Sequence, residues 1–255
     1  MQPWNIAHRG GAGINPENTL PAFADAVARG CDGAELDVQL SRDGVVVVHH
    51  DFRPMAGVAR RGDAWLDTPG PRIRDLTVAE LRAFDIGHPQ PGSAYAAKHP
   101  LVRATYAVVP TLAEVFAVAK PPFRLMVELK CDASVDSADP VELAEKAYAV
   151  TGDVAIYVGF DWRALAPLVK CGAQCWFTTD RLQGDARPVI DRIAQAGGQG
   201  WFPNFLDATP DNIVYARERG LKVGAWTVND PDDMKRLSTL DAICSDRPDL
   251  LQTLE

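Results

Sequence analysis

Residues 33–50 read GAELDVQLSRDGVVVVHH, and this stretch decides the fold that the sequence predicts. In its first part, apolar residues alternate with Glu35 and Asp37, which is the two-residue period of a strand. Successive side chains of a strand point to opposite faces, so both carboxylates lie on one face. The other residues of the segment are apolar, so we expect a buried strand at 33–38 with two acidic groups on its inner side.

The second half of the same stretch is also strand-like, with four consecutive valines before His49 and His50. Two parallel neighbours need a connection of about a dozen residues or more, and far fewer are available here. We therefore expect an antiparallel hairpin that turns at Ser41-Arg42-Asp43-Gly44, where Asp-Gly is a favourable turn pair. The returning arm would bring both histidines back beside Glu35 and Asp37.

Outward from this stretch, short β-branched runs alternate with helical patterns, which is typical of a parallel α/β fold. Eight strands are expected, at 5–8, 33–38, 124–130, 154–160, 174–178, 200–203, 222–228 and 242–245. Helices are expected at 18–29, 111–119, 161–170, 187–196, 210–219, 231–237 and 248–254. Eight parallel strands with one hairpin predict a (β/α)₈ TIM barrel, whose functional residues sit at the carboxyl ends of the strands.

Residues 52–110 interrupt this alternation with seven prolines and five glycines. The one helix expected there spans 78–84, with Thr77 as N-cap and Glu80 as its third residue. So long a loop is usually functional, such as a lid over a binding site, although a passive surface excursion is the alternative. The length of 255 residues suits one α/β barrel, so we expect a single domain at 1–255 that carries this insertion.

Composition and charge exclude several classes of protein. The chain has 26 Lys and Arg against 34 Asp and Glu, a net charge of −8, which disfavours a nucleic-acid partner. It is 47% hydrophobic without a long uncharged apolar run, so no membrane span is expected. The first residues lack the pattern of a signal peptide, which favours a cytoplasmic protein. Five scattered cysteines favour reduced, mostly buried thiols, with a zinc site at Cys171 and Cys175 as the weaker alternative.

Ionisable and polar side chains concentrate where the predicted strands end. They are His8, Arg9, Glu35, Asp37, His50, Asp51, Glu128, Lys130, Trp226, Asn229 and Asp246. In a barrel these groups meet at one rim. Three of them, Glu35, Asp37 and Glu128, would repel one another and call for a cation. Oxygen ligands of this kind suit Mg²⁺ or Ca²⁺ rather than Zn²⁺; the alternative is that Arg9 and Lys130 alone neutralise the carboxylates.

His8 and His50 form the natural acid and base pair, because histidine titrates near physiological pH. A structural role is the alternative for each. His49 should point away from the rim by strand alternation. Arg9 and Lys130 would supply positive charge toward a phosphate group, or would serve only in salt bridges to neighbouring carboxylates.

The motifs that carry these residues resemble the glycerophosphodiester phosphodiesterase family. In order they are His8-Arg9-Gly10-Gly11, Pro16-Glu17-Asn18-Thr19, Glu35-Leu36-Asp37-Val38, Ser41-Arg42-Asp43-Gly44, His50-Asp51, Asp75-Leu76-Thr77, Pro110-Thr111-Leu112, Glu128-Leu129-Lys130, Trp226-Thr227-Val228-Asn229 and Ser245-Asp246-Arg247-Pro248. No single motif is decisive, but the ordered set covers nearly the whole chain. The chain departs from the family at Gly159, where serine is frequent, and at His49, where an apolar residue is frequent.

The resemblance implies a barrel hydrolase that cleaves a glycerophosphodiester, such as glycerophosphocholine or glycerophosphoethanolamine, to sn-glycerol 3-phosphate and an alcohol. It implies His8 and His50 as catalytic residues. Glu35, Asp37 and Glu128 would be ligands of one divalent cation, Mg²⁺ or Ca²⁺. Arg9 and Lys130 would face the phosphate. Apart from the resemblance, the position of Trp226 at the end of a strand suggests that it either packs on the glycerol or closes the pocket.

Two other functions remain open at this point. A related phosphodiesterase of the lysophospholipase D type would need an apolar surface near the insertion, where the sequence offers only scattered apolar residues. A catalytically silent barrel that binds phosphate esters would not need the full set of histidines, carboxylates and cations. A small-molecule substrate is expected in each case.

Overall fold

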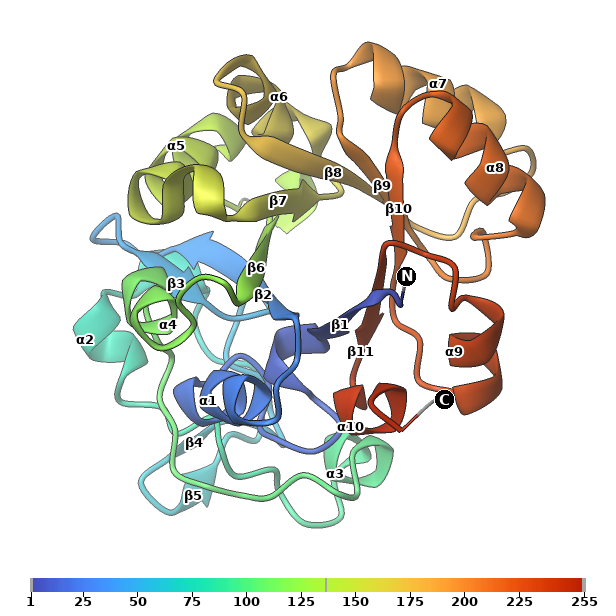
Figure 1. Ribbon diagram of the computed structural model, residues 1–255. Coiled ribbons are helices and arrows are strands. Elements are labelled where there is room, and N and C mark those ends of the chain that lie inside the picture. Colours follow the sequence, from blue (N-terminus) through green and yellow to red (C-terminus); the bar gives the residue numbers. More distant parts are fainter. Residues whose placement is uncertain (1, 136, 254–255) are drawn as a thin grey trace.

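The computed structural model describes residues 2–135 and 137–253, and its strands close into a barrel. Eight of these strands run parallel, and the ring closes where β1 pairs with both β11 and β2. They are β1 (Trp4–Ala7), β2 (Gly33–Leu40), β6 (Arg124–Leu129), β7 (Ile156–Gly159), β8 (Gln174–Thr179), β9 (Gly200–Pro203), β10 (Lys222–Ala225) and β11 (Ala242–Ser245). The predicted TIM barrel is therefore confirmed, with helices around the strands (Figure 1).

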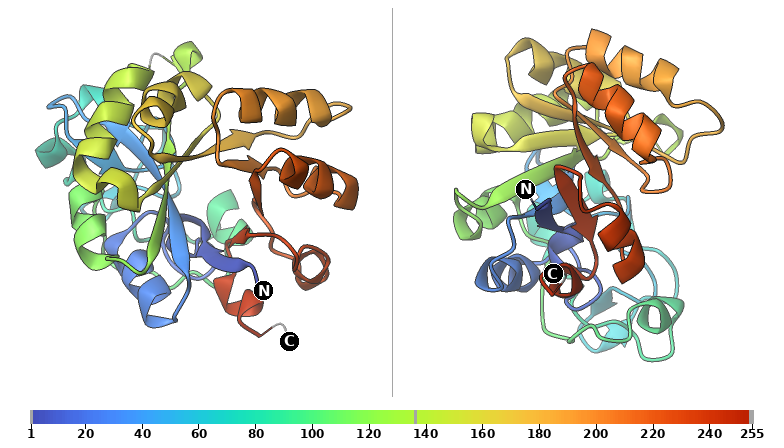
Figure 2. Two further views of the ribbon diagram at one scale, coloured as in Figure 1. Left: turned by 45° about the horizontal axis from the view of Figure 1, so that its top comes forward. Right: turned by 45° about the vertical axis from the view of Figure 1, so that its right-hand side comes forward.

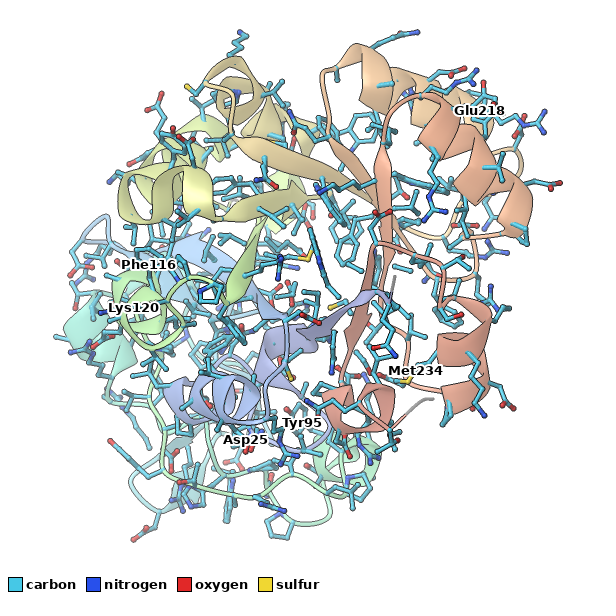
Figure 3. All side chains as sticks on the ribbon, in the orientation of Figure 1. Asp25, Tyr95, Phe116, Lys120, Glu218 and Met234 are labelled. Atoms are coloured by element: carbon cyan, nitrogen blue, oxygen red, sulfur yellow. The ribbon has the colours of Figure 1, made fainter. Side chains whose placement is uncertain are left out.

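The helices of the barrel lie outside the ring of strands in all views (Figures 1 and 2). They are α1 (Leu20–Ala28), α4 (Leu112–Val118), α5 (Pro140–Thr151), α6 (Trp162–Lys170), α7 (Arg187–Gln195), α8 (Pro210–Glu218), α9 (Pro231–Arg236) and α10 (Pro248–Leu251). Each presents one side to the strands: Met234 of α9 is buried, whereas Glu218 at the end of α8 points to solvent (Figure 3). Within the described residues, none of the helices combines the length and apolar character that crossing a membrane requires.

Two hydrophobic layers follow from the alternation of side chains along the strands. Side chains such as Ile6, Met126 and Trp176 fill the inside of the barrel. The intervening ones, such as Leu36 and Val127, pack outward against the helices. Since Leu36 and Val38 of β2 belong to the outer layer, the carboxylates between them point to the inside, as the sequence predicts.

The boundaries differ from the predicted ones in places. The helix α5 was not predicted, although Asp139 caps it and Pro140 is its first residue, which are ordinary start signals. Val154 belongs to a 3₁₀ helix at 152–154, so β7 begins at Ile156 rather than at the predicted residue 154, and β10 ends at Ala225 instead of residue 228. The predicted last helix ends at Leu251, and residue 254 lies outside the described residues.

The predicted hairpin is confirmed. β3 (Val46–Val48) runs antiparallel to β2, with Val38 opposite Val48. The turn closes through hydrogen bonds from the amides of Ser41 and Gly44, and Gly44 has a φ of +73°, which favours glycine. The arm leads directly to His50 at the rim.

The insertion is more ordered than its composition predicts. The expected cap at Thr77 and Glu80 is present, but α2 (Val78–Leu81) is shorter than expected. The insertion also contains β4 (Arg60–Arg61), β5 (Ala64–Trp65) and α3 (Ala94–Lys98), which were not predicted. In chain order the insertion runs through β4, β5, α2 and α3. Figure 1 shows it along the lower left of the molecule, with α2 beside α4 and α3 near α10. A small core that includes Ile73, Leu81 and Phe84 packs on Val47 of the hairpin, so the insertion is anchored to the barrel.

Asp85 organises this insertion. Its carboxylate is almost fully buried and accepts hydrogen bonds from the backbone N–H groups of Gly87 (2.9 Å) and Ala107 (3.1 Å) and from Nε of Arg60 (2.7 Å). His88 Nδ1 lies 2.7 Å from the same carboxylate. Burial by itself would raise the pKa of Asp85, but these donors outweigh it and hold the pKa below its ordinary value.

We expect Asp85→Ala to destabilise the insertion by about 2–4 kcal/mol, because it leaves a partly buried guanidinium without its carboxylate and buried amides without an acceptor. Hydrogen exchange should show faster exchange across 52–110 with little change in the barrel strands. Asp85→Asn is the matched control, since its amide oxygen can still accept from the backbone. Because the folded pKa of Asp85 is depressed, its contribution to stability should vanish as the pH falls below about 4. Unchanged exchange in the alanine variant would contradict this role.

Candidate active site

A cavity of about 550 Å³ opens at the carboxyl ends of the strands, and we call it the main cavity. Seven of the eight predicted site residues line it, namely His8, Arg9, Glu35, His50, Glu128, Lys130 and Trp226. The eighth, Asp37, is 1% exposed and lies beneath the surface of the cavity. Another cavity of about 540 Å³, lined by Asn5, Asp32 and Lys235 among others, lies at the opposite end of the barrel and holds none of them. The structure thus brings the predicted residues together at one rim.

The first of these residues are placed by a tight turn after β1. Arg9 has a φ of +52°, unusual for a residue with a side chain, and Gly10 and Gly11 follow with φ of +82° and +97°. A Cβ on Gly10 would lie 2.8 Å from Cβ of Ala22, so α1 packs directly on this turn. As a result the chain changes direction within three residues, and both His8 and Arg9 line the cavity.

Three carboxylates form a cluster at the floor of the main cavity. Oxygen atoms of Glu35, Asp37 and Glu128 lie within 4.8 Å of one another. Their positions follow from strand register, since Asp37 on β2 is directly opposite Glu128 on β6. Burial, and then the charges of Asp37 and Glu128, raise the pKa of Glu35 well above its usual range. Among the described residues, Oε1 of Glu35 is buried and has no hydrogen-bond partner. This oxygen can therefore accept a bound cation.

Two cationic side chains border the cluster. Lys130 Nζ lies 2.8 Å from Glu128 Oε1 and 3.6 Å from Asp37 Oδ1. Arg9 contacts Glu17 (2.7 Å) and Asp37 (3.3 Å). Although burial would raise the pKa of Asp37, the charges of Arg9, His50 and Lys130 lower it well below its ordinary value.

Charge balance decides what this group of side chains fits. Glu17, Glu35, Asp37 and Glu128 are four acidic groups, and among the described residues the Lys and Arg side chains paired with them are Arg9 and Lys130, with His8 as a third partner only when it is protonated. With the carboxylates ionised, the two cations leave two negative charges without compensation. A site whose donors are all oxygen atoms and which carries two excess negative charges fits a divalent cation such as Mg²⁺ or Ca²⁺.

Each of the two rim histidines has a carboxylate on its Nδ1 atom. His8 Nδ1 is 2.6 Å from Asp246 Oδ1, and its Nε2 lies 3.8 Å from Glu35 Oε2. His50 Nδ1 is 3.0 Å from Asp51 Oδ1. A carboxylate at Nδ1 holds the proton there and leaves Nε2 to exchange protons with a ligand. His49 does not line the main cavity; its Nδ1 faces the carbonyl oxygen of Asp51 at 2.8 Å, and burial lowers its pKa.

Sequence reasoning missed several partners in this site. Asp246 was placed at the rim without a role, yet it pairs with His8 and also accepts a 2.7 Å hydrogen bond from Asn229. These bonds outweigh the effect of burial and hold the pKa of Asp246 well below its ordinary value. Glu17, quoted above only as part of a motif, binds Arg9. The position of Asp246 directly after a strand was the available signal.

The insertion also contributes to the main cavity, through Tyr95, Lys98 and His99. The hydroxyl of Tyr95 donates a 3.0 Å hydrogen bond to Glu17, which itself holds Arg9. Figure 3 shows Tyr95 on the side of the barrel where α3 lies. No local pattern in 52–110 indicated these three residues. The cavity also has an aromatic pair in its lining: Trp226 packs edge-on against Phe160, with ring centroids 5.4 Å apart.

Comparisons with known proteins agree with this geometry. A model of the glycerophosphoryl diester phosphodiesterase family matches residues 8–250. A glycerophosphodiester phosphodiesterase from Bacillus altitudinis is 35% identical over 252 residues, which cover 96% of this chain and 94% of the relative.

Two solved structures extend the likeness to the fold. One from Silicibacter pomeroyi, which carries the same family name, superimposes with a TM-score of 0.88 at 30% identity, covering 97% of this chain and 91% of the other. A phosphodiesterase from Oleispira antarctica, solved with the product sn-glycerol-3-phosphate, has a TM-score of 0.77 at 25% identity, covering 99% and 96%. With a family model that spans nearly the whole chain and a barrel of matching fold, this chain belongs to the glycerophosphoryl diester phosphodiesterase family and is an enzyme of that class.

Proposed function

We propose that this enzyme hydrolyses glycerophosphodiesters, such as glycerophosphocholine or glycerophosphoethanolamine, to sn-glycerol 3-phosphate and an alcohol. The observation that carries the proposal is the main cavity itself, where two histidines, three carboxylates and two cations meet. The product bound by the Oleispira antarctica relative supports the same substrate class. We further propose that 1–255 act as one domain, with the insertion at 52–110 as a subdomain that covers part of the site.

Glu35, Asp37 and Glu128 would hold one divalent cation, Mg²⁺ or Ca²⁺. The partnerless buried oxygen of Glu35 and the uncompensated charge of the cluster support this assignment. Such an ion supplies Lewis-acid stabilisation of charge that develops on a phosphate oxygen. Arg9 and Lys130, already held beside the cluster, would contact the phosphate from the protein side.

His8 and His50 would carry the protons. One accepts a proton from the attacking oxygen as that oxygen bonds to phosphorus. The bond from phosphorus to the alcohol oxygen breaks, and the other histidine donates a proton to the departing alcohol oxygen. The attacking group is a water molecule or the 2-hydroxyl of the glycerol, and in the second case water then opens a cyclic phosphate. Asp246 and Asp51 orient the two imidazoles through Nδ1. Trp226 would pack on the glycerol.

A panel of substrates tests the proposal. Glycerophosphocholine, glycerophosphoethanolamine, glycerophosphoglycerol and a lysophosphatidylcholine are incubated with the enzyme after removal of metal, and then with Mg²⁺ or Ca²⁺ restored. Metal-dependent release of sn-glycerol 3-phosphate from the glycerophosphodiesters is the expected result. Preference for the lysophospholipid would favour the lysophospholipase D alternative, and binding without turnover of any compound would favour a silent barrel.

We expect Asp246→Asn to lower kcat by roughly 10²–10⁴-fold with a small change in KM. The amide cannot stabilise a protonated His8 as a carboxylate does, but it preserves the shape of the site. The loss should appear mainly in the limb of the pH–rate profile that reports the His8 imidazole, which stopped assays across the pH range can resolve. A uniform loss at every pH, with the profile unmoved, would contradict a role through His8.

A further inference from the structure

A second cavity of about 550 Å³ adjoins the main one on the same rim, and we call it the side cavity. Both cavities are lined by Glu128, Lys130 and Phe160. The two therefore meet at the carboxylate and the lysine that the proposed function places at the phosphate. A phosphodiester has two substituents on phosphorus, and the two cavities offer one place for each.

The two cavities differ in the chemistry of their walls. Away from the shared residues, the main cavity combines hydrogen-bonding groups, among them Lys98 and His99, with the rings of Tyr95, Phe202 and Trp226. The side cavity adds aromatic rings, Phe52 and Trp162, to the shared Phe160. The hydroxyls of a glycerol need hydrogen-bond partners, which assigns the glycerol to the main cavity and the departing alcohol to the side cavity.

Two of the aromatic rings are held in place before any ligand binds. The indole of Trp162 donates a 3.2 Å hydrogen bond to the carbonyl oxygen of Thr178 and packs edge-on against Phe177, with centroids 5.1 Å apart. Phe160 packs edge-on against Trp226 and is still 40% exposed. Rings fixed in this way lose little conformational entropy when a ligand packs on them.

The charges around the side cavity do not suit an anionic substituent. Its cations are already paired, Lys130 with Glu128 at 2.8 Å and Arg163 with Asp161 at 2.6 Å. The remaining charged group in the lining is Asp132, whose carboxylate is exposed and accepts from the backbone N–H of Ser134 at 2.8 Å. Among the described lining residues, acidic groups thus outnumber basic ones.

We propose that the side cavity is the subsite for the departing alcohol and that it favours a cationic head group of the choline or ethanolamine type. Ammonium groups are attracted to aromatic faces, and the exposed carboxylate of Asp132 adds a weaker attraction. The assignment of this subsite to the departing alcohol rests on the proposed function. It makes Phe52 and Asp132 determinants of specificity rather than of catalysis.

The test compares substrates that differ in head-group charge. The enzyme is expected to prefer glycerophosphocholine to glycerophosphoglycerol in kcat/KM. Phe52→Ala should lower kcat/KM for glycerophosphocholine by about 2- to 30-fold and leave the glycerophosphoglycerol value within about twofold. Phe52→Leu, which keeps an apolar side chain without a ring, should lose the preference to a similar degree. Asp132→Asn should reduce it without altering turnover of the neutral substrate.

An equal loss for both substrates in Phe52→Ala, or no preference in the unmodified enzyme, would overturn the assignment. Binding of free choline tests the subsite independently of the proposed reaction. If no glycerophosphodiester is cleaved but choline binds, with weaker binding to Phe52→Ala in a ligand-observed NMR titration, the cationic subsite stands and the proposed reaction fails. If glycerophosphodiesters are cleaved and choline neither binds nor inhibits, the reaction stands and the subsite fails.

Discussion

Replacing either His8 or His50 with alanine is expected to lower kcat for glycerophosphodiester hydrolysis by about 10²–10⁴-fold, the usual contribution of one positioned acid or base. Each imidazole is oriented by a carboxylate at Nδ1, and both line the main cavity beside the acidic cluster. Alanine removes the proton carrier but none of the carboxylates that would hold the cation. The decrease should therefore lie in kcat rather than in KM. Steady-state assays at saturating metal concentration measure it.

His49→Asn is the matched control for these variants. His49 is adjacent to His50 in the chain, yet it faces away from the main cavity, and its Nδ1 faces a carbonyl oxygen that an asparagine amide can also reach. We expect this variant to retain turnover within a few-fold. The two assignments fail if His8→Ala or His50→Ala keeps the rate of the unmodified enzyme. Thermal denaturation of each variant separates a loss of chemistry from a loss of folding.

Replacing Glu35 with glutamine should reduce activity to the level of the chelated enzyme, because Lewis-acid stabilisation contributes several kcal/mol, on the order of 10²–10⁴ in rate. Burial and two neighbouring carboxylates raise the pKa of Glu35. An uncharged amide at this position is therefore expected to cost the metal-free protein little stability. The melting temperature offers a second readout. Mg²⁺ or Ca²⁺ should raise it in the unmodified enzyme by mass action and should leave that of Glu35→Gln nearly unchanged.

Glu142→Gln controls for the loss of one carboxylate anywhere on the protein. Glu142 is an exposed residue of α5 that pairs with Lys146 on the surface. This variant should retain the metal-induced rise in melting temperature. Full activity of the unmodified enzyme after dialysis against excess chelator would refute the metal assignment. The alternative left open by the sequence, that Arg9 and Lys130 alone neutralise the carboxylates, would then be favoured.

Much of the fold could be predicted because its signals are local. The alternation of Glu35 and Asp37 with apolar neighbours placed both on the inner face of one strand, and β2 confirms it. The short connection between the two arms of the hairpin required antiparallel pairing, as β3 shows. Local signals were weaker in segments whose apolar residues do not recur at a regular spacing. The helix α3 has five residues, none of them buried, so no apolar stripe marks it in the sequence.

The sequence by itself determined the barrel, the hairpin and the set of side chains at the rim. These depend on the periodicity of adjacent residues and on the rule that parallel strands end at a common edge. Only the tertiary structure decided which of these groups are partners. His8 and Asp246 are 238 residues apart and meet because β1 pairs with β11 when the barrel closes. Tyr95 meets Glu17 because the insertion folds back over the rim. Pairings of this kind depend on closure and packing in three dimensions, and no pattern among neighbouring residues encodes them.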